Sequence, residues 1–324
     1  MPSTQTGAQA ASMIDNRYIP EKKIGQGGAA IVLRCKDSHT GAAVAVKLLR
    51  PGNPLTTVSK ARFHREARLV SSLNHPNIIR ALDYGESTVQ IQEDWANWMF
   101  DNHEKLDFLC MEYIQGPTLK QLIRKTGPVP QGWALTIALQ VADAIRSAHS
   151  AGIIHRDIKP QNIMLLDADT HVIAKLGDFG IARDLNGASL FSLTQTGQIL
   201  GTPDYLAPEQ VLGDPGGKQA DIYAFGIVLY ELLTGKLPFE GENPLAAASR
   251  RMFTDPLPLR SFVSTVSPAL EEVTLRCLQR EQRDRIAGAE EAIEALEWAQ
   301  FRDTIEPIDT WPFSAELRSM LYPL

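Results

Sequence analysis

Residues 153–163 read Ile-Ile-His-Arg-Asp-Ile-Lys-Pro-Gln-Asn-Ile, and the rest of the chain is best interpreted outward from this stretch. Polar side chains alternate here with apolar ones, which predicts a loop entered from a helix and left by a short strand. Asp157 is a carboxylate that could act as a general base, and Asn162 carries an amide oxygen of the kind that binds Mg²⁺. The stretch therefore predicts a catalytic loop that joins a base to a metal ligand.

Two motifs follow this loop in a fixed order. Asp178-Phe179-Gly180 places a second carboxylate beside a glycine that permits a sharp turn, and a carboxylate is a suitable ligand for a hard cation. Residues 201–209, Gly-Thr-Pro-Asp-Tyr-Leu-Ala-Pro-Glu, close a polar loop that begins at Asp178. An accidental match to this ordered set is not credible.

Residues 25–32, Gly-Gln-Gly-Gly-Ala-Ala-Ile-Val, form a predicted glycine-rich turn far upstream of the loop at 153–163. Glycine lets backbone N–H groups approach phosphate oxygens without a Cβ in the way, although a plain hairpin turn has the same look. Lys47 ends the apolar run Val-Ala-Val-Lys, and Glu66 lies midway along the next predicted helix. Taken alone, such a lysine reaches to water and such a glutamate is solvated. Together they suggest an ion pair beside a phosphate-binding turn.

The element pattern divides the chain into a β-rich part and an α-rich part. Extended runs at 18–25, 31–37, 42–49, 78–84 and 107–113, with one helix at 58–73, predict a small antiparallel sheet. Long helices follow at 131–150, 219–234 and 268–279. We therefore expect an α+β fold with a disordered tail at 1–17, an N-lobe at 18–113, a hinge at 112–117, a C-lobe at 118–300 and a C-terminal tail at 301–324.

Composition restricts the function classes further. The 324-residue chain is 44% hydrophobic and 22% charged, as an ordinary globular protein is, and its net charge of -6 argues against nucleic acid as the main partner. Three cysteines, Cys35, Cys110 and Cys277, have no metal-ligand spacing and are expected to be buried in a reducing compartment. No stretch reaches the roughly 18 apolar residues of a membrane span, and the first residues carry no secretory signal. These features predict a cytoplasmic protein.

The ordered motifs resemble the signatures of the protein-kinase family over about residues 18–300. Residues 65–67 (Arg-Glu-Ala), 74–79 (Asn-His-Pro-Asn-Ile-Ile) and 205–210 (Tyr-Leu-Ala-Pro-Glu-Gln) are most similar to the eukaryotic-like serine/threonine kinases of bacteria. The resemblance implies a two-lobed protein kinase fold. It also implies transfer of the ATP γ-phosphate to serine and threonine hydroxyls of proteins, with Mg²⁺ as the metal.

The resemblance assigns roles residue by residue. Lys47 would hold the α- and β-phosphates, Glu66 would fix Lys47, and Asp157 would accept the substrate proton. Lys159 would steady the γ-phosphoryl group, while Asn162 and Asp178 would bind Mg²⁺. The nucleotide would contact Ile24, Gly25, Gln26, Gly27, Gly28, Ala29, Ala30, Ile31, Val32, Ala45, Lys47, Met111, Glu112 and Ile114.

The same resemblance assigns structural roles to three residues, and the chain departs from the family's pattern at two positions. Asp221 would brace the catalytic loop, and Glu209 with Arg285 would form an ion pair of the α-rich lobe. Ala30 stands where the third glycine of the turn is usual, which is expected to alter ATP affinity at most. Gln161 occupies a position that is glutamate in many kinases with basic substrates, so a preference for arginine is not expected.

Three functions remain open on sequence: an active protein kinase, a pseudokinase, and a kinase of small molecules. Lys47, Asp157 and Asp178 are all present, which disfavours a pseudokinase, and the segment 201–209 disfavours a small-molecule kinase. Thr194 and Thr196 are candidate phosphorylation sites in the loop after Asp178. We expect protein substrates and a transient homodimer in which one molecule phosphorylates the other.

Two segments have alternative interpretations. Residues 86–105 contain four clustered large apolar side chains, and they predict either an insertion folded on the small lobe or an exposed docking patch. The tail at 301–324 contains Trp311-Pro312-Phe313 and Met320-Leu321-Tyr322, which is apolar for a solvated linker. We expect it to dock on the α-rich lobe or on a partner, with a frayed tail as the alternative.

Overall fold

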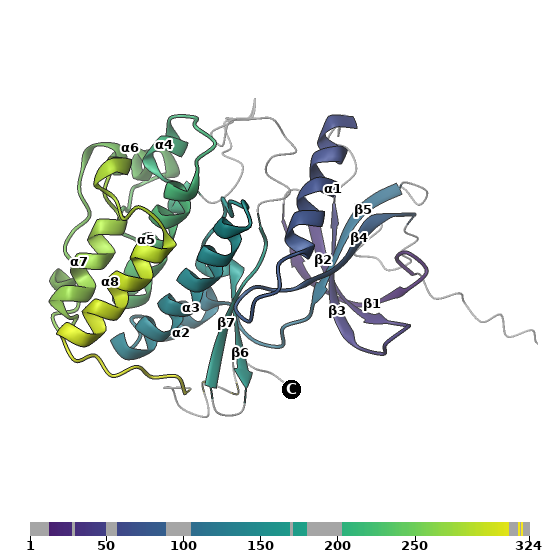
Figure 1. The fold of residues 1–324 in the computed structure, drawn as a ribbon, viewed down its shortest axis with the longest axis horizontal. Coiled ribbons are helices and arrows are strands. Elements are labelled where there is room, and N and C mark those ends of the chain that lie inside the picture. The colour runs from purple at the N-terminus through teal and green to yellow at the C-terminus, as the bar shows by residue number, and fades with distance from the viewer. Residues whose placement is uncertain are drawn as a thin grey trace, which may run out of the picture. The chain divides into compact units, whose positions relative to one another are not determined.

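The computed structural model describes residues 13–27, 30–49, 57–88, 105–168, 171–179, 203–310, 317 and 319. They form two compact units (Figure 1). Unit 1 comprises the described parts of Met1–Ser71 and Ala81–Tyr113, and unit 2 comprises those of Ser72–Arg80 and Ile114–Leu324. The expected α+β architecture is confirmed: in the described residues, unit 1 is a sheet with one helix, and unit 2 is mainly helical.

Unit 1 is built on a five-stranded antiparallel sheet in the order β1-β2-β3-β5-β4. Its strands are β1 (Tyr18–Gln26), β2 (Ala30–Asp37), β3 (Ala43–Leu49), β4 (Ala81–Thr88) and β5 (Lys105–Glu112). The helix α1 (Thr57–Ser71) packs against β4. Residues 14–17, expected in the tail, pack on this sheet: Ile14 is fully buried, and Arg17 donates to both oxygens of Asp37 from its Nε and Nη2 atoms, each at 2.9 Å.

The two faces of this sheet have different characters. Residues directly opposite each other on antiparallel strands share a face, and successive residues alternate between faces. Lys47 lies opposite Val32 and Leu109, and Ala45 lies opposite Met111. The alternate residues of β3 (Val44, Val46 and Leu48) belong to a closed apolar cluster. Four of the predicted nucleotide contacts, Val32, Ala45, Lys47 and Met111, therefore share the face opposite that cluster, whereas Ile31 belongs to the cluster itself and Glu112 lies opposite Val44.

The strand β4 starts three residues later than the expected 78, and the reason is tertiary. Ile78 forms a parallel bridge with Leu176, and the Ile79 N–H donates to the Leu176 carbonyl at 2.8 Å. The segment 72–80 thereby belongs to unit 2. The strand also runs on to Thr88 and β5 begins at Lys105, so both ends of the expected insertion are strand residues. Its aromatic residues lie outside the described part of the chain.

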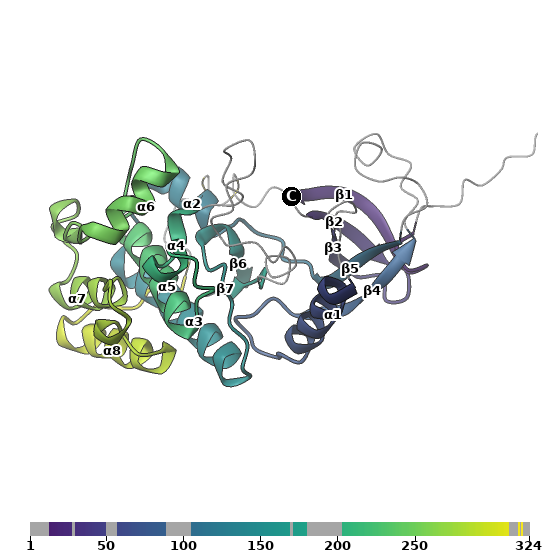
Figure 2. The same cartoon turned by 90° about the horizontal axis from the view of Figure 1, so that it is seen from above.

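Unit 2 contains the helices that the sequence predicts and several that it does not single out. α3 (Gln131–Ser150) has the expected bounds, α5 (Lys218–Thr234) begins one residue early, and α7 (Pro268–Cys277) ends two residues early. The additional helices are α2 (Leu119–Thr126), α4 (Pro208–Val211), α6 (Pro244–Phe253) and α8 (Ala289–Arg302). Figure 2 shows α3, α5, α7 and α8 gathered on one side of this unit. A hairpin of β6 (Ile163–Ala168) and β7 (His171–Leu176) completes it.

The first part of the C-terminal tail docks on unit 2, as expected. The Asp303 carboxylate accepts a hydrogen bond from the Ala269 N–H at 2.8 Å, and Ile305 is buried. Farther along, the Val172 N–H of β7 donates to the Asp309 carbonyl at 2.7 Å. Both apolar runs of the tail, 311–313 and 320–322, lie outside the described residues. In the described helices, none is long and apolar enough to cross a membrane.

Candidate active site

The expected catalytic loop follows α3 and passes through the short 3₁₀ turn Pro160–Asn162 into β6. It brings three polar side chains together at Asp157. The Lys159 ammonium lies 2.9 Å from Asp157 Oδ2, and the Asn162 amide nitrogen donates to the same oxygen at 3.1 Å. That nitrogen also donates to the Asp157 carbonyl at 2.8 Å. The loop thus fixes the carboxylate between a cation and an amide.

The orientation of Asn162 suits a metal ligand. Its nitrogen is used by Asp157, which leaves the amide oxygen as the acceptor of this buried side chain. Asp178, the other expected ligand, is exposed and has a φ of 59°, in the left-handed region that residues with a side chain seldom adopt. In the described part of the chain, no three His, Cys, Asp or Glu residues gather as in a protein-enclosed metal site. The amide and carboxylate oxygens of Asn162 and Asp178 are of the kind that Mg²⁺ prefers, and Mg²⁺ usually takes one or two protein ligands and fills its other positions with water and phosphate.

Asp221 holds the loop from beneath, as expected. Its carboxylate accepts hydrogen bonds from the backbone N–H groups of His155 and Arg156, each at 2.8 Å, and lies 2.8 Å from His149 Nε2. Asp221 is almost fully buried near the start of α5, where the helix dipole favours a negative charge. Arg156 has a φ of 61°, so these two bonds also fix a strained turn directly before the base.

His155 connects the catalytic loop to the end of β7. Its Nδ1 accepts from the Asp157 N–H at 3.2 Å, so its Nε2 carries the proton and donates to the Gly177 carbonyl at 3.0 Å. The ring also lies 4.5 Å from that of Phe179, centroid to centroid. Burial lowers the pKa of His155, because the charged form loses its hydration. A neutral imidazole therefore joins the base to the residue before Asp178.

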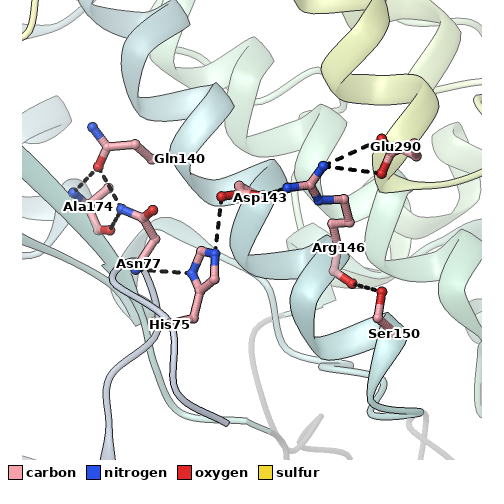
Figure 3. Close-up of polar contacts among 8 residues, drawn as sticks. All are labelled: His75, Asn77, Gln140, Asp143, Arg146, Ser150, Ala174 and Glu290. Carbon is pink, nitrogen blue, oxygen red and sulfur yellow. Dashed lines mark hydrogen bonds and ion pairs between the residues drawn. The ribbon is translucent and has the colours of Figure 1, made fainter.

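The strand β7 leads to Asp178 and pairs with β6 along one edge. Its other edge is bound by a polar network, part of which Figure 3 draws. Gln140 of α3 accepts from the Ala174 N–H at 2.7 Å and donates to the Val172 carbonyl at 3.1 Å. Asn77 donates to the Ala174 carbonyl at 2.9 Å, and its own carbonyl accepts from the Leu176 N–H at 2.8 Å. The strand before the metal ligand is thus hydrogen-bonded on both edges.

The same network extends to the last helix. His75 Nε2 lies 3.1 Å from the Asp143 carboxylate, and Arg146 binds both Asp143 and Glu290 (Figure 3). These contacts tie the segment 72–80, α3 and α8 together within unit 2. Sequence reasoning did not single out Gln140, Asp143 or Arg146, since each is an ordinary polar residue on an amphipathic helix.

The expected nucleotide residues of unit 1 lie on adjoining strands. Gly25 is opposite Val32, and the Gly27 N–H donates to the Ala30 carbonyl at 2.8 Å, which closes the turn between β1 and β2. Ile24 and Gln26 belong to β1, Ile31 to β2, and Met111 and Glu112 end β5. Gly28 and Ala29 lie outside the described residues. Ile114 is a buried residue of unit 2.

Lys47 and α1 lie on the same face of the sheet. His64 Nε2 of α1 is 3.0 Å from Asp107 Oδ1, and alternation along β5 puts Asp107 on the face of Leu109 and Lys47. Glu66 is half-buried on that helix, as Lys47 is on β3. The pairing of Lys47 with Glu66 stays a prediction that this arrangement allows.

The segment 203–209, the described part of the motif at 201–209, is fixed by charged side chains. Arg285 donates to both oxygens of Glu209, at 2.9 and 3.1 Å, which confirms the expected ion pair. The Tyr205 hydroxyl donates to the buried Glu231 carboxylate at 2.6 Å, and Lys120 of α2 binds the same carboxylate. Burial raises the pKa of Tyr205, so the hydroxyl keeps its proton. The sequence did not reveal Lys120 or Glu231, because nothing in their spacing marks them.

A small cleft, with room for about one water molecule, lies between the base and this segment. It is lined by Arg156, Asp157, Ile158, Tyr205, Leu206, Gln210, Ala220, Asp221 and Ala224. Residues 180–202, with Thr194, Thr196 and Thr202, lie outside the described part of the chain. What the structure describes is therefore the expected base with its cation and amide, the two expected metal ligands, and a water-sized cleft between the base and residues 205 and 206.

Comparison with known proteins gives the same picture. Residues 18–298 match the model of the protein kinase domain. The chain is 37% identical over 289 residues to a probable serine/threonine-protein kinase of Corynebacterium efficiens, which covers 88% of this chain and 41% of that protein. It is 36% identical over 294 residues to a serine/threonine-protein kinase of Myxococcus xanthus, covering 90% and 51%. The chain thus spans about half the length of these curated relatives or less.

Solved structures have the same fold. The Mycobacterium tuberculosis PknI kinase domain is 25% identical, with a TM-score of 0.66 over 90% of this chain and 100% of that chain. Rad53, crystallised with AMP-PNP, is also 25% identical, with a TM-score of 0.66 over 89% of this chain and 65% of that chain. The family model, the relatives and the geometry of the catalytic loop agree, and the chain belongs to the protein kinase family, among the bacterial serine/threonine kinases.

Proposed function

We propose that this chain transfers the γ-phosphate of ATP to serine and threonine hydroxyls of proteins, as a non-specific serine/threonine protein kinase. The observation that carries the proposal is the position of Asp157, whose carboxylate is held by Lys159 and Asn162 and lines a cleft with Tyr205 and Leu206. A carboxylate placed in this way can accept the proton of a hydroxyl that a protein substrate presents to it.

The other expected residues take complementary parts. Lys47 would hold the α- and β-phosphates of the nucleotide, Lys159 would steady the γ-phosphoryl group, and Asn162 with Asp178 would hold Mg²⁺. The metal supplies charge screening on the phosphates, which the chain's own cations complete. Since phosphoryl transfer needs little covalent chemistry from the protein, positioning and electrostatic stabilisation account for most of the catalysis. The complex of Rad53 with AMP-PNP supports ATP as the nucleotide.

The proposal is tested by incubating the purified chain with labelled ATP, Mg²⁺ and a generic protein substrate. We expect phosphoserine and phosphothreonine in the substrate, and none when EDTA removes the metal. A pseudokinase would bind ATP without labelling any protein. A small-molecule kinase would consume ATP only when a hydroxylated small molecule is added, so either result would overturn the proposal.

A further inference from the structure

Two adjacent arginines on α6 have opposite environments. Arg250 is exposed, whereas Arg251 is 2% exposed and is among the largest fully buried side chains of the protein. The helix is fixed at its start, where the Asn243 side chain accepts from the Ala246 N–H and Pro244 fills the first turn. Its rotation therefore directs one arginine to water and the next one inward.

The buried guanidinium binds the backbone of the segment before Tyr205. Its Nη1 donates to the Pro203 carbonyl at 2.9 Å and its Nη2 to the Asp204 carbonyl at 2.7 Å. Its carbon lies 5.8 Å from the centre of the Phe239 ring. In the part of the chain that the structure describes, its side chain has no carboxylate within ion-pair distance, and burial lowers its pKa.

A buried cation without a carboxylate partner is a costly feature unless it does something that an apolar residue cannot do. The desolvation penalty of a buried charge often exceeds its gain, and apolar residues of similar volume are often as stable or more stable in its place. The fork-shaped guanidinium fixes the orientation of the backbone here, because its two N–H groups lie in one plane and bind two successive carbonyl groups. Arg251 is therefore better explained by the shape that it gives this segment than by stability.

The shape of this segment matters for the cleft beside Asp157. Tyr205 and Leu206 follow the two bound carbonyls and line that cleft together with the base. On the other side, the Tyr205 hydroxyl is fixed by Glu231. The segment 203–205 is thus held at its backbone by one buried charge and at its last side chain by another.

We propose that Arg251 is a positioning residue for the protein substrate, acting through the carbonyls of Pro203 and Asp204. The expected effect on catalysis rests on the proposed kinase function. The expected effect on the conformation of the segment 203–205 does not. Arg251 touches neither substrate nor nucleotide in this assignment. It fixes the backbone of residues 203 and 204, next to the residues that adjoin the base, where the proposed function places the polypeptide, so its loss weakens productive binding of the protein substrate while transfer chemistry at Asp157 is retained.

The test compares Arg251→Met and Arg251→Lys with Arg250→Met in the full chain. Methionine keeps much of the volume without the charge, and lysine keeps the charge without the fork. We expect kcat/KM for a protein substrate to fall about tenfold in Arg251→Met. We expect a smaller loss in Arg251→Lys and none in Arg250→Met. KM for ATP and the hydrolysis of ATP without protein substrate should stay within twofold in all three.

Hydrogen exchange gives a readout that does not depend on kinase activity. The Leu206 N–H donates to the Pro203 carbonyl at 3.2 Å, so exchange across residues 203–207 should accelerate in Arg251→Met and not in Arg250→Met. Equal exchange in the two variants would overturn the positioning role even if no phosphorylation were found. Loss of ATP hydrolysis in parallel with a fall in Tm would overturn it too, since it would mark Arg251 as a general support of the fold.

Discussion

At the scale of single residues, the base is the first assignment to examine. Asp157→Asn preserves the shape of the side chain and removes the proton acceptor. Turnover of a protein substrate should fall by about 100-fold or more, because general base catalysis contributes roughly that much. ATP affinity should be retained, since Asp157 is not among the nucleotide contacts. Steady-state kinetics and nucleotide titration on the two proteins check this, and turnover within tenfold of the unmutated protein would contradict it.

A second residue, His155, should make stability depend on pH. Burial lowers its pKa in the folded protein, so below the ordinary value of about 6.5 the unfolded chain binds a proton that the folded chain does not. The free energy of unfolding should therefore fall as the pH falls below this value, by up to about 1.4 kcal/mol per unit. Above it, His155 is neutral in both states and contributes no slope.

Urea unfolding at pH 7.5, 6.5 and 5.5 measures this slope. His155→Gln removes the titrating ring, and the variant should be less stable at every pH because the bonds to Asp157 and Gly177 change. Its stability should also fall less steeply below pH 6.5 than that of the unmutated protein. Parallel curves for the two proteins would mean that another group carries the acid sensitivity.

The residues that the sequence identified share one property. Asp157, Asn162 and Asp178 are recognised by chemistry at fixed spacing, which is visible without a fold. Arg251 is not recognisable in this way, because Arg250 beside it is identical in type and only helix rotation separates them. Gln140 is missed for the same reason, since its role depends on the edge of a strand thirty or more residues away.

At the scale of elements, the tail and α3 are fitted to each other at Gly132. The Glu306 carbonyl oxygen would lie 2.0 Å from a Cβ at this position, and the Ile308 N–H donates to the Gly132 carbonyl at 3.3 Å. A glycine inside a helix ordinarily costs about 0.5–1 kcal/mol relative to alanine. Its presence in the first turn of a buried helix is explained by the backbone that crosses it.

Gly132→Ala should therefore destabilise the protein, by about 1–3 kcal/mol, since the backbone of the tail must move. In a chain that ends at Arg302 and so lacks the tail, Gly132→Ala should instead increase the stability of the protein. Thermal unfolding of the four proteins measures this cycle, and Gly288→Ala is the control because an added methyl group there would meet no heavy atom within 4 Å. A stabilising Gly132→Ala in the full chain would show that residues 303–310 do not dock in solution.

The elements also show where sequence patterns stop. α3 was predicted with both ends, because Pro130 precedes its first turn and the glycine at 152 follows its last. The start of β4 was misplaced because residues 78 and 79 are apolar and strand-like, yet they pair with Leu176 rather than with β5. Local pattern cannot tell which strand an extended segment will join.

At the scale of the whole molecule, sequence predicted the two-part architecture through the change from short extended runs to long helices near residue 117. It could not predict that 72–80 belongs with the helical unit, because that follows from side chains such as Asn77 and His75 meeting α3 and β7. A contact of this kind depends on two elements far apart in the chain.

The last prediction concerns two whole molecules. Thr194 and Thr196 belong to a stretch of sequence, residues 189–197, that carries no basic residue, and a phosphate there adds about -1.5 to -2 charges for arginines such as Arg156 to bind. We expect phosphorylation of this loop to pass from one molecule to another. The initial rate of phosphate incorporation per molecule should then rise in proportion to protein concentration, whereas transfer within one molecule gives a constant rate.

A mixing experiment separates the two routes. Asp157→Asn should remain unphosphorylated alone and should gain phosphate on Thr194 and Thr196 when a small amount of unmutated protein is added, as mass spectrometry of a size-tagged variant can follow. The same variant that also carries Thr194→Ala and Thr196→Ala is the matched control and should gain little. If phosphate appears only on the unmutated molecules, each chain modifies itself, and the transient homodimer is not needed for phosphorylation of the loop.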